Sequence, residues 1–270
     1  MWGDIAIAFL LAFITAFVLT PYTMRLAKKV GAIDIPNDRR VNKKPMPRLG
    51  GVAVICGFLV STVYLLIVMN LEHSVDLFGE EQYWLKMLGF FIGIVILGIT
   101  CFIDDAKGVP SWVKLIMQII SAVIVVACGV RIQNVHLPFL DDKIGLNEWF
   151  SCGLTICWII GITNAINLID GLDGLSSGIT LISCFSLLII FTLNKSPLIA
   201  VLLIAALGGA IVGFLPFNFS PARTFIGDTG SNFLGFSLAI ISILRSSQNL
   251  YSHCINCSNY YTCLLYTSPS

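Results

Sequence analysis

Asn164-Ala-Ile-Asn-Leu-Ile-Asp-Gly-Leu-Asp-Gly174 follows directly on the apolar run from Phe150 to Gly161. Carboxylates and carboxamides at the end of a bilayer-spanning segment are costly unless they face water, a partner or an ion. The glycines allow the chain to turn and let a ligand approach the backbone. Repeated small residues alone would indicate close helix packing, but packing does not account for the two Asp residues. The stretch therefore predicts a functional site at the end of a membrane helix.

The composition predicts the environment of this site. Of the 270 residues, 57% are hydrophobic and only 11% are charged, with a mean hydropathy of +0.89. These values exclude an ordinary soluble globular domain. Apolar runs long enough to cross the hydrocarbon layer recur along the chain, which predicts an all-α, polytopic membrane protein. We predict eight spans, at 4–24, 49–69, 84–103, 111–130, 149–168, 177–193, 197–216 and 231–244.

These spans form one predicted multi-pass domain over residues 1–244, with no separate soluble domain. The first apolar run, Ile5 to Leu19, lacks a basic segment before it and a small-residue cleavage site. We interpret it as a membrane helix and not as a removed signal peptide.

The distribution of charge predicts the orientation. The loop at 25–48 carries eight of the sixteen Lys and Arg residues, whereas the loop at 70–83 has four acids and no basic residue. Basic loops stay in the cytoplasm, so the N-terminus is expected outside. Alternation of the spans then assigns the loops 25–48, 104–110, 169–176 and 217–230 to the cytoplasmic side.

The unusual acids fall on that same side. They are Asp34, Asp38, Asp104, Asp105, Asp170, Asp173 and Asp228. The topology therefore predicts one active site at the cytoplasmic helix ends and loops, facing the cytoplasm.

The adjacent acids Asp104 and Asp105 follow an apolar run that ends at Phe102-Ile103. Neighbouring carboxylates repel each other unless a cation or proton intervenes, and Mg²⁺ is a hard ion that uses one or two carboxylates together with substrate phosphates. The alternative is a solvated helix end with Lys107 as its partner. The pair alone does not decide between these interpretations.

Two further motifs gain weight from their place on the same side. Phe225-Ile-Gly-Asp228-Thr-Gly-Ser231 has the form of a turn with a helix cap when taken alone. Asn42-Lys-Lys44-Pro-Met-Pro-Arg48-Leu-Gly-Gly51 ends the basic loop, and such a loop often serves topology alone. The functional interpretation is that Lys44 or Arg48 meets a phosphate group.

Taken together and in order, these blocks resemble the polyprenyl-phosphate N-acetylhexosamine-1-phosphate transferases of glycosyltransferase family 4, over about residues 1–244. The Pro-Arg-x-Gly-Gly form resembles the branch that uses UDP-N-acetylglucosamine, which includes enzymes of teichoic-acid and O-antigen synthesis. The resemblance implies transfer of N-acetylglucosamine-1-phosphate from the UDP-sugar to undecaprenyl phosphate in the bacterial cell membrane, with release of UMP. This would be the first membrane step of cell-envelope glycan synthesis.

The resemblance also implies roles for individual residues. Asp104 and Asp105 match the paired catalytic aspartates, and Asp228, with Asp104, matches the ligands of Mg²⁺, for which Mn²⁺ is an alternative. The positions implied to bind substrate are Lys44, Arg48, Asn164, Asn167, Asp170, Gly171, Asp173 and Phe225, the last against uracil. The implied partners are both substrates, the bilayer and a second copy in a homodimer, with no nucleic acid.

Phosphoryl transfer needs positioning and neutralisation of charge, which a metal ion and the basic loop would supply. We expect Asp104 or Asp105 to deprotonate the lipid phosphate for direct attack, and a covalent aspartyl intermediate is the alternative. Other hypotheses are the sister phospho-N-acetylmuramoyl-pentapeptide transferase, a transporter or channel with a cation site, and a truncated, non-catalytic membrane protein. Acids gathered on one face argue against a transporter, whose charges lie near the midplane.

The segment 245–270 departs from the family pattern. It is rich in Ser, Asn, Tyr and Cys and holds no spanning segment, and its Cys254-x-x-Cys257 lacks a second pair for zinc. Family members would continue with further membrane helices and a His-x-His-His block. We therefore expect a chain truncated at its C-terminal end, with a disordered or artefactual tail, and the sequence does not decide between an active and an inactive chain.

Overall fold

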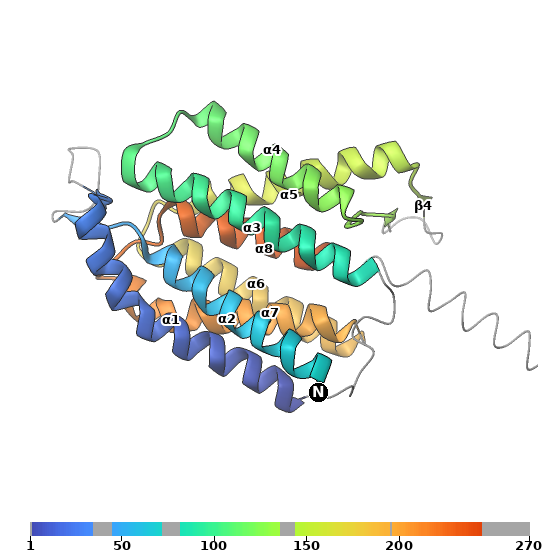
Figure 1. Cartoon of the computed structure of the whole chain (residues 1–270), viewed down its shortest axis with the longest axis horizontal. Helices are drawn as coiled ribbons and strands as arrows, with labels where there is room; N and C mark the ends of the chain where they lie inside the picture. Colours follow the sequence, from blue (N-terminus) through green and yellow to red (C-terminus); the bar gives the residue numbers. More distant parts are fainter. Residues whose placement is uncertain (1, 35–44, 72–81, 136–143, 195, 245–270) are drawn as a thin grey trace, which may run out of the picture.

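The computed structural model describes residues 2–34, 45–71, 82–135, 144–194 and 196–244, and within them the fold is a bundle of eight helices (Figure 1). The helices are α1 (Trp2–Val30), α2 (Gly50–Leu71), α3 (Gln82–Lys107), α4 (Ser111–Ala127), α5 (Glu148–Ile169), α6 (Leu175–Leu193), α7 (Leu198–Asn218) and α8 (Gly227–Leu244). Six of them, all except α4 and α8, are long and apolar enough to cross a membrane. The predicted all-α, polytopic membrane fold is confirmed.

Each predicted span corresponds to one helix, but several boundaries differ where polar residues begin. The helix α3 continues through both of its acids to Lys107, and α8 begins at Gly227, four residues before the predicted start. The helix α1 likewise runs on to Val30, and α6 begins at Leu175. The acids of two predicted loops therefore lie in helical turns, where the backbone holds them.

Successive helices run in opposite directions, so their ends gather at two poles. The ends of α1, α3, α5 and α7 lie at one pole with the starts of α2, α4, α6 and α8, on the left in Figure 1. At the opposite pole, Trp2, Trp84 and Trp149 are exposed at the starts of α1, α3 and α5. Exposed Trp residues gather at membrane–water interfaces, which is consistent with helices that cross the bilayer from pole to pole.

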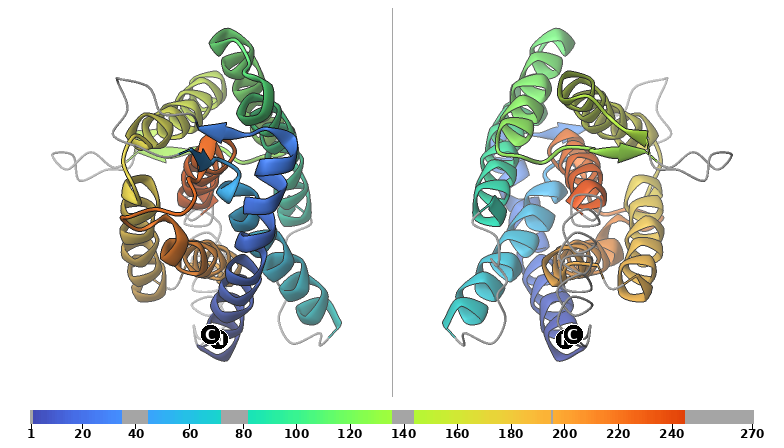
Figure 2. Two further views of the ribbon diagram at one scale, coloured as in Figure 1. Left: turned by 90° about the vertical axis from the view of Figure 1, so that its left-hand side faces the viewer. Right: turned by 90° about the vertical axis from the view of Figure 1, so that its right-hand side faces the viewer.

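The helices α7 and α8 form the inside of the bundle. In the end-on views of Figure 2 they lie within the ring made by the other helices. The helix α7 is apolar along its whole length and packs against α1, α2 and α6, whereas α8 packs against α5, α3 and α2. A Cβ at Gly209 or Gly213 would overlap the carbonyl oxygen of Phe9 or Phe13 on α1, so these glycines set how closely α1 and α7 approach.

Two short antiparallel hairpins complete the described fold. The strands β1 (Ile33–Asp34) and β2 (Met46–Pro47) pair with Ile33 opposite Pro47, and β3 (Asn134–Val135) pairs with β4 (Ile144–Gly145). The first hairpin lies at the same pole as the predicted acids and leads directly into α2. Lys44 and the tail 245–270 lie outside the described residues, so the predictions for them stay predictions.

Candidate active site

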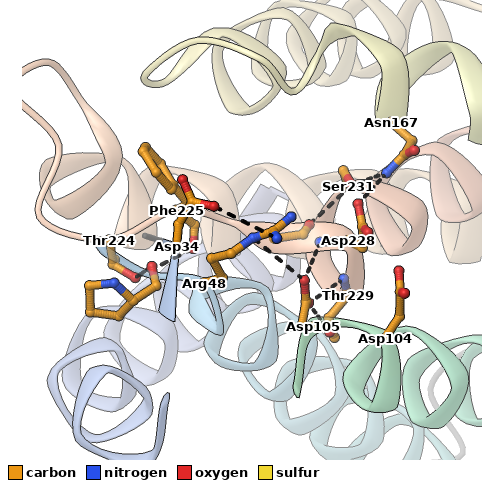
Figure 3. Close-up of polar contacts among 12 residues, drawn as sticks. Asp34, Arg48, Asp104, Asp105, Asn167, Thr224, Phe225, Asp228, Thr229 and Ser231 are labelled. Atoms are coloured by element: carbon orange, nitrogen blue, oxygen red, sulfur yellow. Dashed lines mark hydrogen bonds and ion pairs between the residues drawn. The ribbon is translucent and has the colours of Figure 1, made fainter. Parts of the chain in front are cut away.

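The carboxylate of Asp105 holds the N-terminus of α8. Its Oδ1 accepts a hydrogen bond from the backbone N–H of Asp228 at 3.0 Å. Its Oδ2 accepts bonds from the backbone N–H and the hydroxyl of Thr229, at 2.9 and 2.6 Å. The first N–H groups of a helix lack acceptors within that helix. For α8 the acceptor is the carboxylate of Asp105 on α3 (Figure 3). The Asp105 side chain has no exposed surface.

The other acid of the pair, Asp104, faces Asp228 across an ammonium group. The Nζ of Lys114 on α4 lies 2.7 Å from Oδ2 of Asp104 and 3.1 Å from Oδ2 of Asp228. The sequence offered Lys107 as a partner for the acids, but Lys107 is exposed and Lys114 makes the ion pairs. Three helices thus bring two negative charges and one positive charge together.

Each of these two carboxylates is also held by a hydrogen bond to its other oxygen, Oδ1. Oδ1 of Asp104 accepts a hydrogen bond from the backbone N–H of Val109 at 2.6 Å, within the turn that follows α3. The side-chain amide of Asn167 on α5 donates to Oδ1 of Asp228 at 2.9 Å and to the hydroxyl of Ser231 at 2.8 Å (Figure 3). Asn167, a predicted site residue, therefore orients Asp228.

Arg48 is positioned at the site by a ladder of backbone hydrogen bonds between two of the sequence motifs. The N–H of Phe225 donates to Pro47, and the N–H groups of Gly50 and Gly51 donate to Phe225 and Ile226, at 2.8 to 3.0 Å. The ladder leaves the guanidinium of Arg48 in long ion-pair contact with Asp34 (3.9 Å) and Asp105 (4.0 Å).

The glycines of these motifs allow the chains to approach closely. A Cβ at Gly51 would overlap the backbone of Gly230, and a Cβ at Gly227 would overlap the carbonyl oxygen of Arg48. Gly227 also has a φ of +71°, which other residues rarely adopt. The two motifs are therefore one structural unit, in which packing explains the glycines.

The loop between α5 and α6 is pinned at both of its acids. The hydroxyl of Ser176 donates to Oδ1 of Asp170 at 2.6 Å, and the N–H of Ala222 donates to Oδ2 of Asp173 at 3.1 Å. Burial raises the pKa of the Asp170 carboxyl to about 6, against the effect of the Ser176 hydrogen bond and with a contribution from the charge of Asp228. A Cβ at Gly171 would meet open space, so this part of the loop is accessible.

A buried amide network lies one helical turn from Lys114. The amide of Gln118 on α4 donates to Asn232 on α8 at 2.8 Å, and Asn164 on α5 donates to Gln118 at 2.8 Å. The amide of Asn232 also donates to the carbonyl of Asp228 at 2.8 Å. Asn164, which was predicted to bind substrate, thus contacts the network that joins the three helices carrying Lys114, Asn167 and Asp228.

The structure therefore gathers the acids Asp104, Asp105 and Asp228 with Arg48 and Asn167, and it puts Asp170 and Asp173 on the adjoining loop. The backbone of Phe225 belongs to the ladder, and its side chain is half-buried. Sequence reasoning missed Lys114, Gln118, Thr229 and Asn232. The signal for the first two was a Lys and a Gln four residues apart in an otherwise apolar segment, a spacing that puts them on one helix face.

The donor set fits a divalent cation only in part. Among the described residues, no three His, Cys, Asp or Glu side chains are grouped closely enough to hold a metal ion by themselves. Within the same residues, however, the buried Oδ2 of Asp104 receives no hydrogen bond, because its contact with Lys114 is an ion pair without hydrogen-bond geometry. Mg²⁺ commonly takes one or two carboxylates and completes its shell with water and substrate phosphates. Asp104 and Asp228 fit that pattern.

Sequence comparisons with known proteins identify relatives of this chain. The model of the family described as glycosyl transferase family 4 matches residues 87–246. The chain is 37% identical over 240 residues to a Bacillus subtilis protein named a probable undecaprenyl-phosphate N-acetylglucosaminyl 1-phosphate transferase, covering 89% of this chain and 63% of that protein. It is 34% identical over 255 residues to a Mycobacterium tuberculosis decaprenyl-phosphate N-acetylglucosaminephosphotransferase, covering 89% of this chain and 60% of that protein.

A third relative is the phospho-N-acetylmuramoyl-pentapeptide-transferase of Lactiplantibacillus plantarum, which is 33% identical over 261 residues, with 90% of this chain and 75% of the relative covered. The chain thus spans a little under two thirds of the length of the first two relatives. The family model matches more than half of the chain, across the helices that carry Asp104, Asp105, Lys114, Asn167 and Asp228. On this evidence the chain is a member of glycosyl transferase family 4.

Proposed function

We propose that this protein transfers N-acetylglucosamine-1-phosphate from UDP-N-acetylglucosamine to undecaprenyl phosphate and releases UMP. One observation carries the proposal: three acids from α3 and α8 lie with two cationic side chains, Lys114 and Arg48, at one pole of a membrane bundle. Further support comes from the names of the Bacillus subtilis and Mycobacterium tuberculosis relatives, which specify a polyprenyl-phosphate acceptor and N-acetylglucosamine.

Both substrates are anions, so a site made only of carboxylates would repel them. Arg48 offers a forked guanidinium that suits phosphate oxygens, and Lys114 adds a second positive charge. The acceptor phosphate lies at the level of the lipid headgroups, and the nucleotide sugar arrives from water. Helix ends at one pole of the bundle are a place that both substrates can reach.

Asp104 and Asp228 would hold Mg²⁺, with Mn²⁺ as the alternative. When bound there, the ion would neutralise charge on the non-bridging phosphate oxygens. Asn167 keeps Asp228 oriented, and Val109 keeps Asp104 oriented. The protein therefore supplies two fixed carboxylates and leaves the remaining coordination to water and substrate.

In the proposed reaction an oxygen of the acceptor phosphate forms a bond to the β-phosphorus of the UDP-sugar. The bond from that phosphorus to the oxygen of UMP breaks, and UMP leaves with that oxygen. We assign to Asp104 the acceptance of any proton from the acceptor phosphate, because its Oδ2 receives no hydrogen bond among the described residues. The oxygens of Asp105 are engaged by the N-terminus of α8, which favours direct attack over an Asp105 intermediate.

The loop that carries Asp170, Gly171 and Asp173 adjoins the acids and is assigned to the nucleotide. Phe225 is assigned to the uracil ring. Asn164 is assigned a supporting role, since its amide contacts Gln118.

The site is assigned to the cytoplasmic face of the bacterial cell membrane, with the N-terminus outside. Support comes from basic residues at the pole of the site, which include Lys28, Lys29, Lys107 and Arg223. An excess of Lys and Arg marks the cytoplasmic side of membrane proteins.

The test is UMP release by the purified chain in lipid nanodiscs, with undecaprenyl phosphate, Mg²⁺ and either UDP-N-acetylglucosamine or UDP-N-acetylmuramoyl-pentapeptide. We expect turnover with the first donor and its loss on chelation of the metal. Asp104→Asn should lower kcat by roughly a hundredfold or more, the size typical of a lost acid–base group. Glu148→Gln, at the opposite pole, should leave kcat unchanged. Turnover with the second donor alone would reassign the substrate, and no turnover with either would contradict the proposal.

A further inference from the structure

We propose that the ammonium group of Lys114 and the divalent cation compete for one position, the gap between Asp104 and Asp228. The inference rests on the metal use put forward under the proposed function and goes beyond it, since it assigns Lys114 a role in metal loading. Its basis is the pair of distances, 2.7 Å and 3.1 Å, from one nitrogen to oxygens of two carboxylates on different helices. The ammonium lies where a bridging cation would bind.

The three groups differ in how firmly they are held. Asp104 is fixed by the N–H of Val109, and Asp228 is fixed by the amide of Asn167. Lys114 stands on a flexible four-carbon stem, and its side chain is 21% exposed. The carboxylates therefore stay in place while the ammonium has both the freedom and a path to leave.

Electrostatic repulsion prevents the ammonium and the divalent cation from occupying the gap together. Two carboxylates this close to each other repel unless a positive charge lies between them, and the ammonium supplies that charge in the absence of metal. A divalent ion added beside it would bring two cations into contact distance in a partly buried site, where their repulsion is only weakly screened. Binding of the ion therefore expels the ammonium.

The expelled ammonium remains within reach of the site. It becomes available to an anionic group next to the metal, which in the proposed reaction is the phosphate of a substrate. Metal loading would then convert Lys114 from a counter-ion of the acids into a ligand for phosphate. The two events are coupled because one nitrogen takes part in both.

The first test measures Mn²⁺ binding to the substrate-free protein in nanodiscs, from the loss of the free-ion signal in electron paramagnetic resonance. Lys114→Met should tighten the apparent Kd by roughly tenfold or more, because it removes a unit charge at contact distance. Lys114→Arg, which retains the charge, should bind no more tightly than the wild type. Lys107→Met is the matched control, since it removes an exposed positive charge three residues from Asp104, and it should leave the Kd unchanged. Asp228→Asn should abolish this binding.

A second measurement uses the wild-type protein and does not depend on the folding of a variant. Acetylation of lysine amines, followed by mass spectrometry, should modify Lys114 slowly without metal and several-fold faster with saturating Mn²⁺. Lys107 serves as the internal reference, and its modification should not change.

An unchanged or weaker Mn²⁺ affinity in Lys114→Met, binding that survives Asp228→Asn, or metal-independent acetylation of Lys114 would each overturn the inference. UMP release is measured on the same preparations. Competition for Mn²⁺ without turnover would contradict the proposed function alone, whereas turnover without competition would contradict the inference alone.

Discussion

Asp105 and Thr229 join the end of α3 to the start of α8 through two hydrogen bonds to a single carboxylate oxygen. Oδ2 of Asp105 accepts from the backbone N–H and from the hydroxyl of Thr229, at 2.9 and 2.6 Å. Hydrogen bonds to a charged acceptor are stronger than those between neutral groups. This contact fixes the first turn of α8, and Asp228 stands in that turn.

Thr229→Val removes one of these donors and keeps the shape of the side chain. We expect the free energy of unfolding to fall by about 1.5–3 kcal/mol, the usual size for a buried hydrogen bond to a charged group. We also expect kcat to fall, since Asp228 loses its fixed position. Denaturant titration in detergent and UMP release measure the two effects. Thr192→Val is the control, because the Thr192 hydroxyl donates to Leu188 of its own helix, and equal losses in both variants would contradict the assignment.

Gly51→Ala tests the close approach of the two motifs. A Cβ at Gly51 would overlap the backbone of Gly230 and lie 2.7 Å from the carbonyl oxygen of Ile226. Since backbone cannot move aside as a side chain does, we expect a loss of roughly 1–3 kcal/mol in unfolding free energy or a failure to fold. Gly153→Ala on α5 meets nothing within 4 Å and should be neutral or stabilising by about 0.5–1 kcal/mol. Thermal unfolding of both variants distinguishes packing from general sensitivity to an added methyl group.

Gln118→Leu tests the amide network among α4, α5 and α8. The substitution removes the hydrogen bonds that Gln118 makes with Asn164 and Asn232, which should lower the unfolding free energy by about 1–3 kcal/mol. Lys114, one turn away, should also lose its position, so kcat should fall further than stability alone requires.

The control for this variant lies on the next turn of the same helix. Ser121 is buried, and its hydroxyl has no hydrogen-bond partner among the described residues. Ser121→Ala should therefore keep both stability and kcat. A Gln118→Leu variant with wild-type kcat would show that the network does not position Lys114.

The fold followed from the sequence because one strong constraint determines it: an apolar segment of about twenty residues has few alternatives to a membrane helix. The convergence of Asp104, Asp105 and Asp228 followed from the alternation of the spans. The sequence did not predict the helix boundaries near these residues. Asp105 satisfies the first N–H groups of α8, so that helix starts before the point where apolar residues begin.

The sequence alone also did not predict the ion-pair and hydrogen-bond partners of the acids. Lys107 and Lys114 are both near Asp104 along the chain, and only the fold turns Lys114 toward it. Likewise, Asn164 and Asn167 lie on one face of α5 by their spacing, yet one contacts Gln118 and the other Asp228. Spacing along a helix predicts which side chains share a face of that helix. It does not predict which residue of a neighbouring helix each of them contacts.

The Asp170 carboxyl predicts a dependence of stability on pH. Burial raises its pKa in the folded protein from 3.8 to about 6. A group whose pKa is raised by folding contributes stability that is fully present below its unfolded pKa and is lost as the pH rises through its folded pKa. The contribution of Asp170 should therefore be complete below pH 3.8 and disappear as the pH passes about 6.

Asp170→Asn removes this titration and keeps a side chain of the same size that can still accept the Ser176 hydrogen bond. The midpoint of thermal unfolding should therefore rise in the variant relative to the wild type above pH 6, where the wild-type carboxylate is charged and half-buried. A raised pKa requires the two midpoint curves to diverge as the proton leaves Asp170. Parallel midpoints for Asp170→Asn and the wild type from pH 4.5 to pH 7.5 would therefore show that folding does not raise the pKa of Asp170.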